Sequence, residues 1–213
     1  MQTQRVTILV FTLFLLLLLS PPRADAATTA RPPRDLLRSS CAKARYPTLC
    51  VQTLSNFSNL ATKPLDLAQA AVKVSLARTR TLSVYFKTLK ATSSSRFGKR
   101  QRVAVSDCVQ QISDSVTQLS NTLNELQHLR AGTFQWQMSN AQTWTSAALT
   151  NGDTCFTGFN DGAASSADSS KIKLEVKRRI TGVAMLTSNA LYLINRLGDD
   201  SVSEKPRETD PVP

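Results

Sequence analysis

The chain has 213 residues, enough for one domain of ordinary size, and 41% of them are hydrophobic. Lys and Arg number 26 against 15 Asp and Glu, and the resulting net charge of +11 favours polyanions or acidic partner surfaces. The sequence contains no helix-turn-helix signature, RNA-binding aromatic motif or zinc finger, which argues against a nucleic-acid-binding protein.

Residues 1–26 have the features of a secretory signal peptide. Arg5 supplies a positive charge, Val6–Leu19 is largely apolar, and Ala24–Ala26 offers the small residues that signal peptidase requires. The apolar run is shorter than the ~20 residues of a membrane span, so an uncleaved signal anchor is the weaker alternative. We expect cleavage after Ala26, secretion, and a mature chain that has no membrane attachment.

The mature chain is predicted to be one folded domain between two flexible ends. Residues 27–35 and 198–213 are rich in Pro and charged side chains and contain few apolar residues, which favours disorder. The domain itself spans 36–197, with a helical hairpin over 36–63 and a four-helix bundle over 64–197.

The hairpin is predicted from two short helical segments. Leu36–Ala44 and Thr48–Leu54 flank Tyr46-Pro47, and this unit is too small to be stable alone. It also contains Asn56-Phe57-Ser58, an N-glycosylation sequon, so Asn56 is a candidate glycosylation site.

Four segments of the bundle repeat apolar residues at alternating spacings of three and four, which places one apolar stripe on each of four helices. The segments are 68–89, 105–126, 138–159 and 176–197. In the second segment the stripe consists of Val105, Val109, Ile112, Val116, Leu119, Leu123 and Leu126. No segment of useful length shows the alternation of a strand. The fold class is therefore all-α, and the short connections predict an up-down-up-down four-helix bundle.

Helix-breaking residues separate these segments. Pro64 opens the first helix, and Gly98 precedes the second. Gly132 is placed for a left-handed cap after the second helix, and Asn160–Gly162 follows the third. Gly198 is expected to end the fourth helix.

The cysteines of the mature chain are Cys41, Cys50, Cys108 and Cys155. An even number in a secreted chain favours two disulfides. Of the three possible connectivities we expect the sequential one, with one bridge across the hairpin and one between the second and third helices. A metal site is the weak alternative, because no pair has C-x-x-C spacing and His128 is the only histidine.

The sequence offers no catalytic machinery. His128 is alone within a helical segment, the serines lack a G-x-S-x-G elbow, and the carboxylates are scattered singly. A glycine-rich phosphate loop and a dinucleotide fingerprint are also missing. We therefore expect a protein that is not an enzyme and uses no metal or cofactor.

Residues Ser139–Cys155 (SNAQTWTSAALTNGDTC) closely resemble the hallmark segment of plant pectin methylesterase inhibitors. The same segment occurs in the inhibitor-like pro-regions of pectin methylesterases. The resemblance extends over the mature chain, through the Cys41/Cys50 hairpin, Cys108 and the final amphipathic helix. The chain is therefore similar to the invertase and pectin methylesterase inhibitor family.

The family has two branches on one fold, so the fold does not decide the target. Invertase inhibitors share a Pro-Lys-Phe motif ahead of the fourth cysteine, whereas Ala131–Trp136 (AGTFQW) lacks the Pro-Lys pair. The Gln142–Thr150 run resembles the pectin methylesterase branch instead. A complete pectin methylesterase would continue into a β-helical catalytic domain, and because this chain stops at Pro213 we expect a free inhibitor.

The resemblance implies a reversible 1:1 complex in the plant cell wall (apoplast), in which the bundle covers the enzyme's substrate cleft. The second and third helices would supply most contacts, with help from the fourth. Asp114 and Thr154 match contact positions, and Thr117 and Thr157 replace residues that are often acidic in relatives. We expect these four side chains to contact the enzyme, with an ordinary polar helix surface as the alternative.

Two other functions are open on the sequence alone. One is inhibition of an acid invertase (β-fructofuranosidase), the target of the other branch. The second is a basic wall protein with no enzyme target that binds acidic, de-esterified pectin through the clusters around Arg100 and Lys177. In each case we expect the mature protein to be a monomer.

Overall fold

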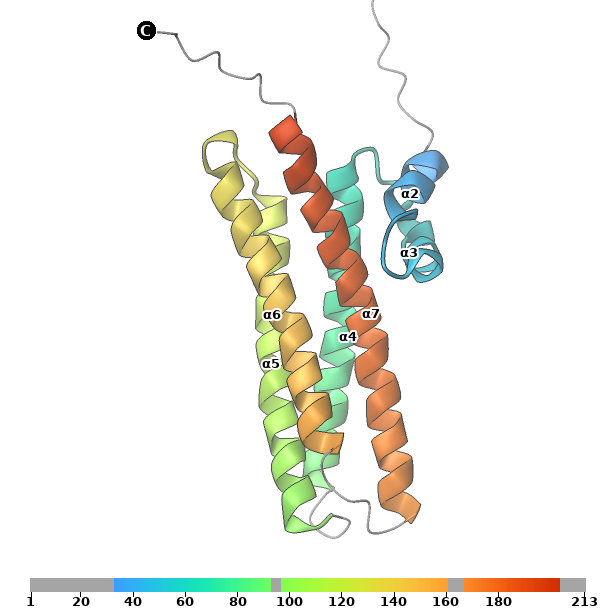
Figure 1. The fold of residues 1–213 in the computed structure, drawn as a ribbon, viewed down its shortest axis with the longest axis vertical. Helices are drawn as coiled ribbons and strands as arrows, with labels where there is room; N and C mark the ends of the chain where they lie inside the picture. Colours follow the sequence, from blue (N-terminus) through green and yellow to red (C-terminus); the bar gives the residue numbers. More distant parts are fainter. Residues whose placement is uncertain (1–32, 93–96, 161–166, 204–213) are drawn as a thin grey trace, which may run out of the picture. The chain divides into compact units, whose positions relative to one another are not determined.

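The computed structural model of the protein describes residues 33–92, 97–160 and 167–203, and the regular structure of these residues is helical (Figure 1). The elements are α2 (Pro33–Cys41), α3 (Pro47–Leu54), η1 (Ser55–Phe57), α4 (Pro64–Ala91), α5 (Lys99–Gln127), η2 (Ala131–Thr133), α6 (Phe134–Asn160) and α7 (Ala167–Ser203). The all-α class predicted from the sequence is confirmed. The signal peptide expected at 1–26 lies outside the described residues.

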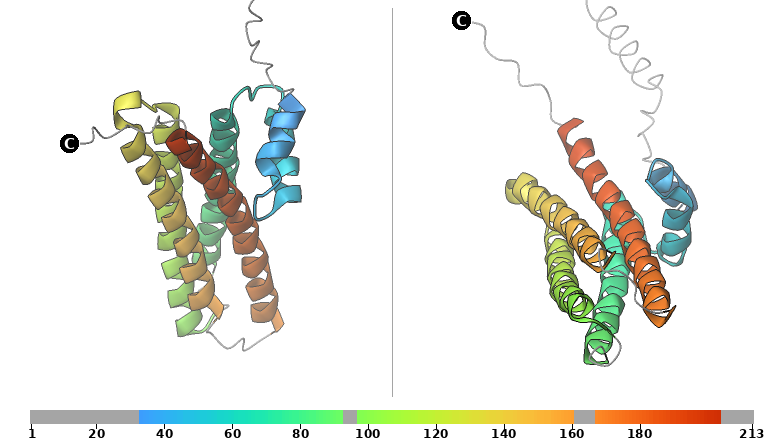
Figure 2. Two further views of the ribbon diagram at one scale, coloured as in Figure 1. Left: turned by 45° about the horizontal axis from the view of Figure 1, so that its top comes forward. Right: turned by 60° about the horizontal axis from the view of Figure 1, so that its bottom comes forward.

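Helices α4 to α7 form an antiparallel bundle in which each helix packs against its two neighbours in the order α4, α5, α6, α7, and α7 closes onto α4. The α2–α3 hairpin packs on α4 and α7, on the side away from α5 and α6 (Figure 2). This is the up-down-up-down bundle with an N-terminal helical hairpin that the sequence predicts. The outer face of the α5–α6 pair therefore lies opposite the outer face of the α4–α7 pair.

Prolines mark the start of three of these helices. Pro33, Pro47 and Pro64 each occupy the first helical position, where the missing N–H costs nothing. The carboxylate of Asp66 accepts hydrogen bonds from the backbone N–H groups of Thr62 (2.8 Å) and Lys63 (3.0 Å) just ahead of α4. A carboxylate here also interacts favourably with the helix dipole, so the entry into the bundle is fixed locally.

Two helix ends differ from the sequence expectation. Helix α2 begins at Pro33, inside the segment predicted to be flexible, and α7 continues through Gly198 to Ser203. A Cβ atom at Gly198 would lie 3.4 Å from Nε2 of Gln142, so this glycine lets α7 pass close to α6 and does not end the helix. Of the predicted C-terminal tail, 198–203 is helical and 204–213 lies outside the described residues.

The turn between α5 and α6 does not use the left-handed glycine cap that was expected at Gly132. No described glycine has a positive φ, and Gly132 lies in η2. The buried side chain of Gln137 fills this role instead. Its Nε2 donates to the carbonyl of His128 (2.8 Å), and its Oε1 accepts from the backbone N–H of Arg130 (2.9 Å). Gln137 thereby satisfies one carbonyl and one N–H group of the backbone that joins α5 to η2.

The core stripe of α4 matches the sequence prediction, but that of α5 is shifted. Val109, Val116 and Leu123 of the predicted stripe are only half-buried. The buried positions that replace them carry small side chains, and the observed stripe is Val105, Cys108, Ile112, Ser115, Leu119, Thr122 and Leu126. The prediction was wrong at these positions because it ranked residues by hydrophobicity, whereas a close helix contact selects for small volume.

Helices α5 and α6 meet through these small residues. We call this contact the α5–α6 seam: Cys108, Ser115 and Thr122 of α5 with Ala141, Thr145, Ala148 and Cys155 of α6. The Ser115 hydroxyl lies within hydrogen-bond distance of the carbonyls of Gln111 (2.9 Å) and Ala148 (3.3 Å). The hydroxyls of Thr122 and Thr145 lie 3.3 Å apart. The polar groups of the seam are hydrogen-bonded, so their burial carries little desolvation penalty.

The hairpin is fastened to α7 by polar contacts. Asn189, which is only 3% exposed, accepts from the backbone N–H of Tyr46 (3.0 Å) and donates to its carbonyl (2.9 Å). The guanidinium of Arg196 donates to the carbonyls of Ser39 (3.3 Å) and Ser40 (3.5 Å) near the end of α2. These bonds fix the corner of the hairpin and the end of its first helix on the bundle.

We predict that Ser115→Leu lowers the free energy of unfolding by about 1–3 kcal/mol, because the larger side chain overpacks the seam and removes its hydroxyl. Urea denaturation at fixed pH measures the change. Asn124→Leu, at an exposed position of the same helix, is the matched control and should change stability by less than about 0.5 kcal/mol. Equal losses in the two variants would contradict the close packing of α5 on α6.

Candidate functional site

The outer surface of the α5–α6 pair brings together side chains from both helices. Nδ2 of Asn151 donates to Oε1 of Gln118 at 3.0 Å, which joins the two helices across this surface. Asp114 precedes Gln118 by one turn, and Thr154 follows Asn151 by one turn on the antiparallel helix. Asp114 and Thr154 therefore lie on the same side of this bond. We call the surface around these four residues the α5–α6 outer face.

The two residues expected to be contacts in this region are held by local bonds. Asp114 is half-buried, and its Oδ1 accepts a hydrogen bond from Nε2 of Gln110 at 2.9 Å. Thr154 is exposed, and its hydroxyl donates to the carbonyl of Thr150 at 2.9 Å. The side chains are thus oriented before any partner arrives.

Thr117 and Thr157, the other two expected contacts, are both exposed. Thr157 lies one turn beyond Thr154, and both line a shallow hollow of about 440 Å³ on α6, together with Thr150, Asp153 and Gly158. Thr117 lies three residues after Asp114 on α5, and its hydroxyl lies 3.4 Å from the carbonyl of Ser113. Neither α5 residue lines the hollow, so the structure groups the four residues as two pairs on neighbouring helices.

A disulfide lies directly beneath this surface. Cys108 is bonded to Cys155, both are buried, and their Cα atoms lie 4.7 Å apart. Thr154 precedes Cys155 in the chain, and Asp114 lies six residues after Cys108. The second disulfide joins Cys41 to Cys50 in the hairpin. The bridge of the bundle thus restrains the helices that carry all four expected contacts.

Charge divides the bundle into two unlike halves. Helix α5 opens with Lys99, Arg100 and Arg102, whereas residues 103–160, which hold the rest of α5 and all of α6, contain four carboxylates and one arginine. Helix α4 alone contains five basic residues and one acidic residue. The α5–α6 outer face is therefore weakly acidic, and the opposite side of the bundle is strongly basic.

The structure offers no catalytic or metal arrangement in the part of the chain that it describes. No three His, Cys, Asp or Glu side chains are grouped there as a metal site would require. His128 is exposed, with Nδ1 2.8 Å from the carbonyl of Asn124. A separate finding concerns membranes. None of the described helices has a stretch that is long and apolar enough to span one.

Sequence reasoning missed Gln110, Gln118 and Asn151. The only signal for Gln110 and Gln118 was their spacing of four residues on either side of Asp114, which places them on one helix edge. The pairing of Gln118 with Asn151 depends on the register between two helices, which no local pattern encodes.

Comparisons with known proteins give one consistent picture. A family model described as plant invertase/pectin methylesterase inhibitor matches residues 35–193. Pectinesterase inhibitor 3 of Arabidopsis thaliana is 46% identical over 180 residues, which cover 82% of this chain and 83% of that protein. Pectinesterase inhibitor 9 of the same plant is 37% identical over 199 residues, covering 88% and 94%.

A solved structure resembles the fold. The crystal structure of a mutant form of a pectin methylesterase inhibitor from Arabidopsis superposes with a TM-score of 0.54 at 21% identity, covering 73% of this chain and 92% of that chain. At this level of identity the similarity bears on the fold alone, and it supports the helical bundle described above.

We predict that replacing Cys108 and Cys155 together with alanine lowers the free energy of unfolding by about 4 kcal/mol, because this bridge spans a sequence separation of 47. Replacing Cys41 and Cys50, whose separation is 9, should cost about 2.5 kcal/mol. Denaturant unfolding under non-reducing conditions gives both values. A larger loss from the hairpin pair would contradict the assignment of the main restraint to the bundle.

Proposed function

Because the chain belongs to the plant invertase/pectin methylesterase inhibitor family, we propose that it is a proteinaceous inhibitor of pectin methylesterase (pectinesterase). Relatives at 46% and 37% identity bear the name pectinesterase inhibitor, which favours this target over an acid invertase. The absence of a Pro-Lys pair in Ala131–Trp136 supports the same choice.

The α5–α6 outer face is the proposed contact with the enzyme, and its character is the observation that carries the proposal. An enzyme cleft that holds a polymer of uronic acids presents basic groups and hydrogen-bond donors. A weakly acidic surface of carboxylate, amide and hydroxyl groups complements such a cleft. The basic helices α4 and α7 would be repelled by it, and so would Lys99, Arg100 and Arg102 at the start of α5, so charge favours docking through the later part of α5 and through α6.

The size and rigidity of this surface also fit an inhibitor. Helices α5 and α6, of 29 and 27 residues, are each about 40 Å long and about 10 Å wide. Side by side they present an outer surface of about 800 Å², which is the area that each partner contributes to a standard protein–protein interface. The seam and its disulfide order the surface in advance, which reduces the entropy lost on association. Binding without a covalent step gives a reversible 1:1 complex that covers the substrate cleft.

The leader expected at residues 1–26 and the two disulfides support a secreted protein. Two disulfides require an oxidising environment, and residues 1–26 carry secretory signal features. The proposed site of action is the plant cell wall, where a secreted monomer meets its target. The Asn56 side chain is exposed on η1, on the hairpin side, so a glycan there would leave the α5–α6 outer face free.

The target is tested by adding the purified mature protein to a pectin methylesterase and, separately, to an acid invertase. We expect the methylesterase rate to fall with a 1:1 equivalence point and the invertase rate to stay constant. Inhibition of the invertase alone would assign the chain to the other branch. Loss of neither rate would overturn the proposed function.

We predict that Asp114→Lys weakens pectin methylesterase inhibition at least roughly tenfold, or about 1.4 kcal/mol, because it places a cation against a basic cleft. Asp35→Lys makes the same charge change at an exposed position of α2 and is the control. Inhibition constants at one pH and salt concentration decide the matter. If the two variants inhibit equally well, Asp114 does not lie in the interface.

A further inference from the structure

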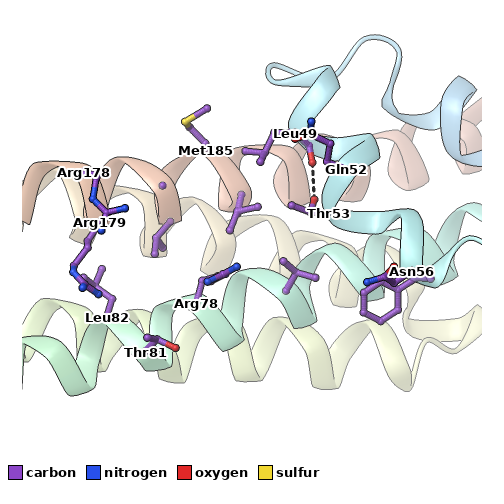
Figure 3. A pocket seen from close by; sticks show the side chains of 15 residues that line it. Leu49, Gln52, Thr53, Asn56, Arg78, Thr81, Leu82, Arg178, Arg179 and Met185 are labelled. Atoms are coloured by element: carbon purple, nitrogen blue, oxygen red, sulfur yellow. Dashed lines mark hydrogen bonds between the residues drawn. The ribbon is translucent and has the colours of Figure 1, made fainter. Parts of the chain in front are cut away.

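A groove lies on the side of the bundle opposite the proposed enzyme contact. The α2–α3 hairpin and η1 form one wall, and α4 and α7 form the rest, as Figure 3 shows. Its volume is about 730 Å³, within the range of about 300–1,000 Å³ that is usual for small-ligand sites. Apolar side chains lie along it, among them Leu49, Phe57, Val74 and Leu186.

Three guanidinium groups line the groove. Arg178 and Arg179 lie at one end, Asn56 lies at the other, and Arg78 lies between them (Figure 3). Within the part of the chain that the structure describes, Arg78 has no ion-pair partner. The groove therefore presents cations at two places along its length, which suits a ligand with repeated negative charges.

The paired arginines are held in place by their neighbours. Arg178 donates two hydrogen bonds of 2.8 Å to the carboxylate of Glu175, and Arg179 also bonds to it. The Arg179 guanidinium lies 4.4 Å from the centre of the Tyr85 ring. These hydrogen bonds lower the pKa of Glu175 to about 2, so it stays ionised in mild acid. Three guanidinium groups against one carboxylate leave the cluster positive.

Uncharged hydrogen-bonding groups complete the lining. The exposed amide of Gln52 lies on the hairpin wall, and the exposed hydroxyl of Thr81 lies on α4. Apolar side chains can contact the C–H faces of sugar rings, amides can bond to ring hydroxyls, and guanidinium groups pair with carboxylates. This combination is the chemistry of an acidic oligosaccharide site, and a purely cationic patch would lack the apolar floor.

We propose that the groove binds an oligomer of galacturonic acid with free carboxylates, as in de-esterified pectin. The choice of galacturonate among the uronic acids rests on the proposed function, since a pectin methylesterase produces this polymer. Because the groove lies opposite the α5–α6 outer face, the protein can hold the polymer and the enzyme at once. Such tethering raises the local concentration of the inhibitor where its target works.

Two glycines allow the groove to be blocked without a change in charge. Gly182 lines the groove and Gly158 lines the hollow on α6, and a Cβ added at either would have no heavy atom within 4 Å. Both lie inside helices, where replacement of glycine favours the helical state. Gly182→Trp and Gly158→Trp are therefore a matched pair.

The test is isothermal titration of the mature protein with an oligomer of about ten galacturonate units at fixed pH and salt, with inhibition measured in parallel. We expect Gly182→Trp to weaken oligomer binding at least tenfold and to leave inhibition unchanged. Gly158→Trp should do the reverse. Unchanged oligomer binding by Gly182→Trp, with helicity and unfolding like the parent protein, overturns the proposal.

A charge-matched set separates the groove from general surface attraction. The double variant Arg78→Gln with Arg178→Gln should weaken oligomer binding at least tenfold. The control, Arg80→Gln with Lys87→Gln, removes the same charge from exposed positions of α4 outside the groove, and it should weaken oligomer binding less than threefold. Equal losses of affinity in the two double variants would mean that surface charge alone accounts for the binding, and would overturn the proposal.

The ligand class is tested with two further probes. The methyl-esterified oligomer should bind at least tenfold more weakly than the free acid, and a glutamate decapeptide should also bind at least tenfold more weakly. Equal affinity for the peptide would mean an acidic protein segment is the natural ligand and would overturn the carbohydrate assignment. If the parent protein does not inhibit pectin methylesterase, the proposed function is wrong. The oligomer-binding results would still stand, so the two proposals can fail separately.

Discussion

The close contact of α5 with α6 is the constraint on which the rest of the structure depends. Small side chains at Cys108, Ser115 and Thr122 let the two helices approach until a disulfide joins them at a Cα separation of 4.7 Å. The hydroxyls in this seam bond to the facing helix, so polarity at the centre of the bundle does not weaken it. The pair then acts as one rigid body whose outer surface is fixed before binding.

The same bundle separates two kinds of surface. Because α4 and α7 pack together on the far side, their basic side chains lie opposite the weakly acidic α5–α6 outer face. The hairpin adds a wall to the basic side through the contacts of Asn189 and Arg196 with its backbone. Without this docking the groove would be an open helix surface. Much of the positive charge of the described residues thus lies on the side opposite the proposed enzyme contact.

Much of the fold was predictable from residue spacing. The spacing of three and four in 68–89 predicted a stripe whose members are all buried: Ala68, Val72, Ser75, Thr79, Leu82, Phe86 and Leu89. Pro64 marks the start of that helix. The stripe of α5 could not be assigned as well, because Ser115 and Thr122 are core residues only where another helix comes close. Glycine was read as a helix terminator at Gly198, whereas it provides room for the Gln142 side chain.

The binding surfaces were less accessible to sequence reasoning. Asp114 and Thr154 were singled out through a family resemblance, and nothing local indicated that Gln118 and Asn151 would bond to each other beside them. The groove depends on Arg78 and Arg178, which are 100 residues apart in the chain and line one groove only because α4 packs on α7. Patterns within a helix predict which side faces the core, but the register between helices decides which polar groups share a surface.

Hydrogen–deuterium exchange of the mature protein, alone and with saturating pectin methylesterase, tests the central claim most directly. The account predicts added protection in peptides from 104–121 and 145–159 and no change in peptides from 47–57 and 74–86. Protection confined to the hairpin, α4 and α7 would place the enzyme on the basic side and contradict it.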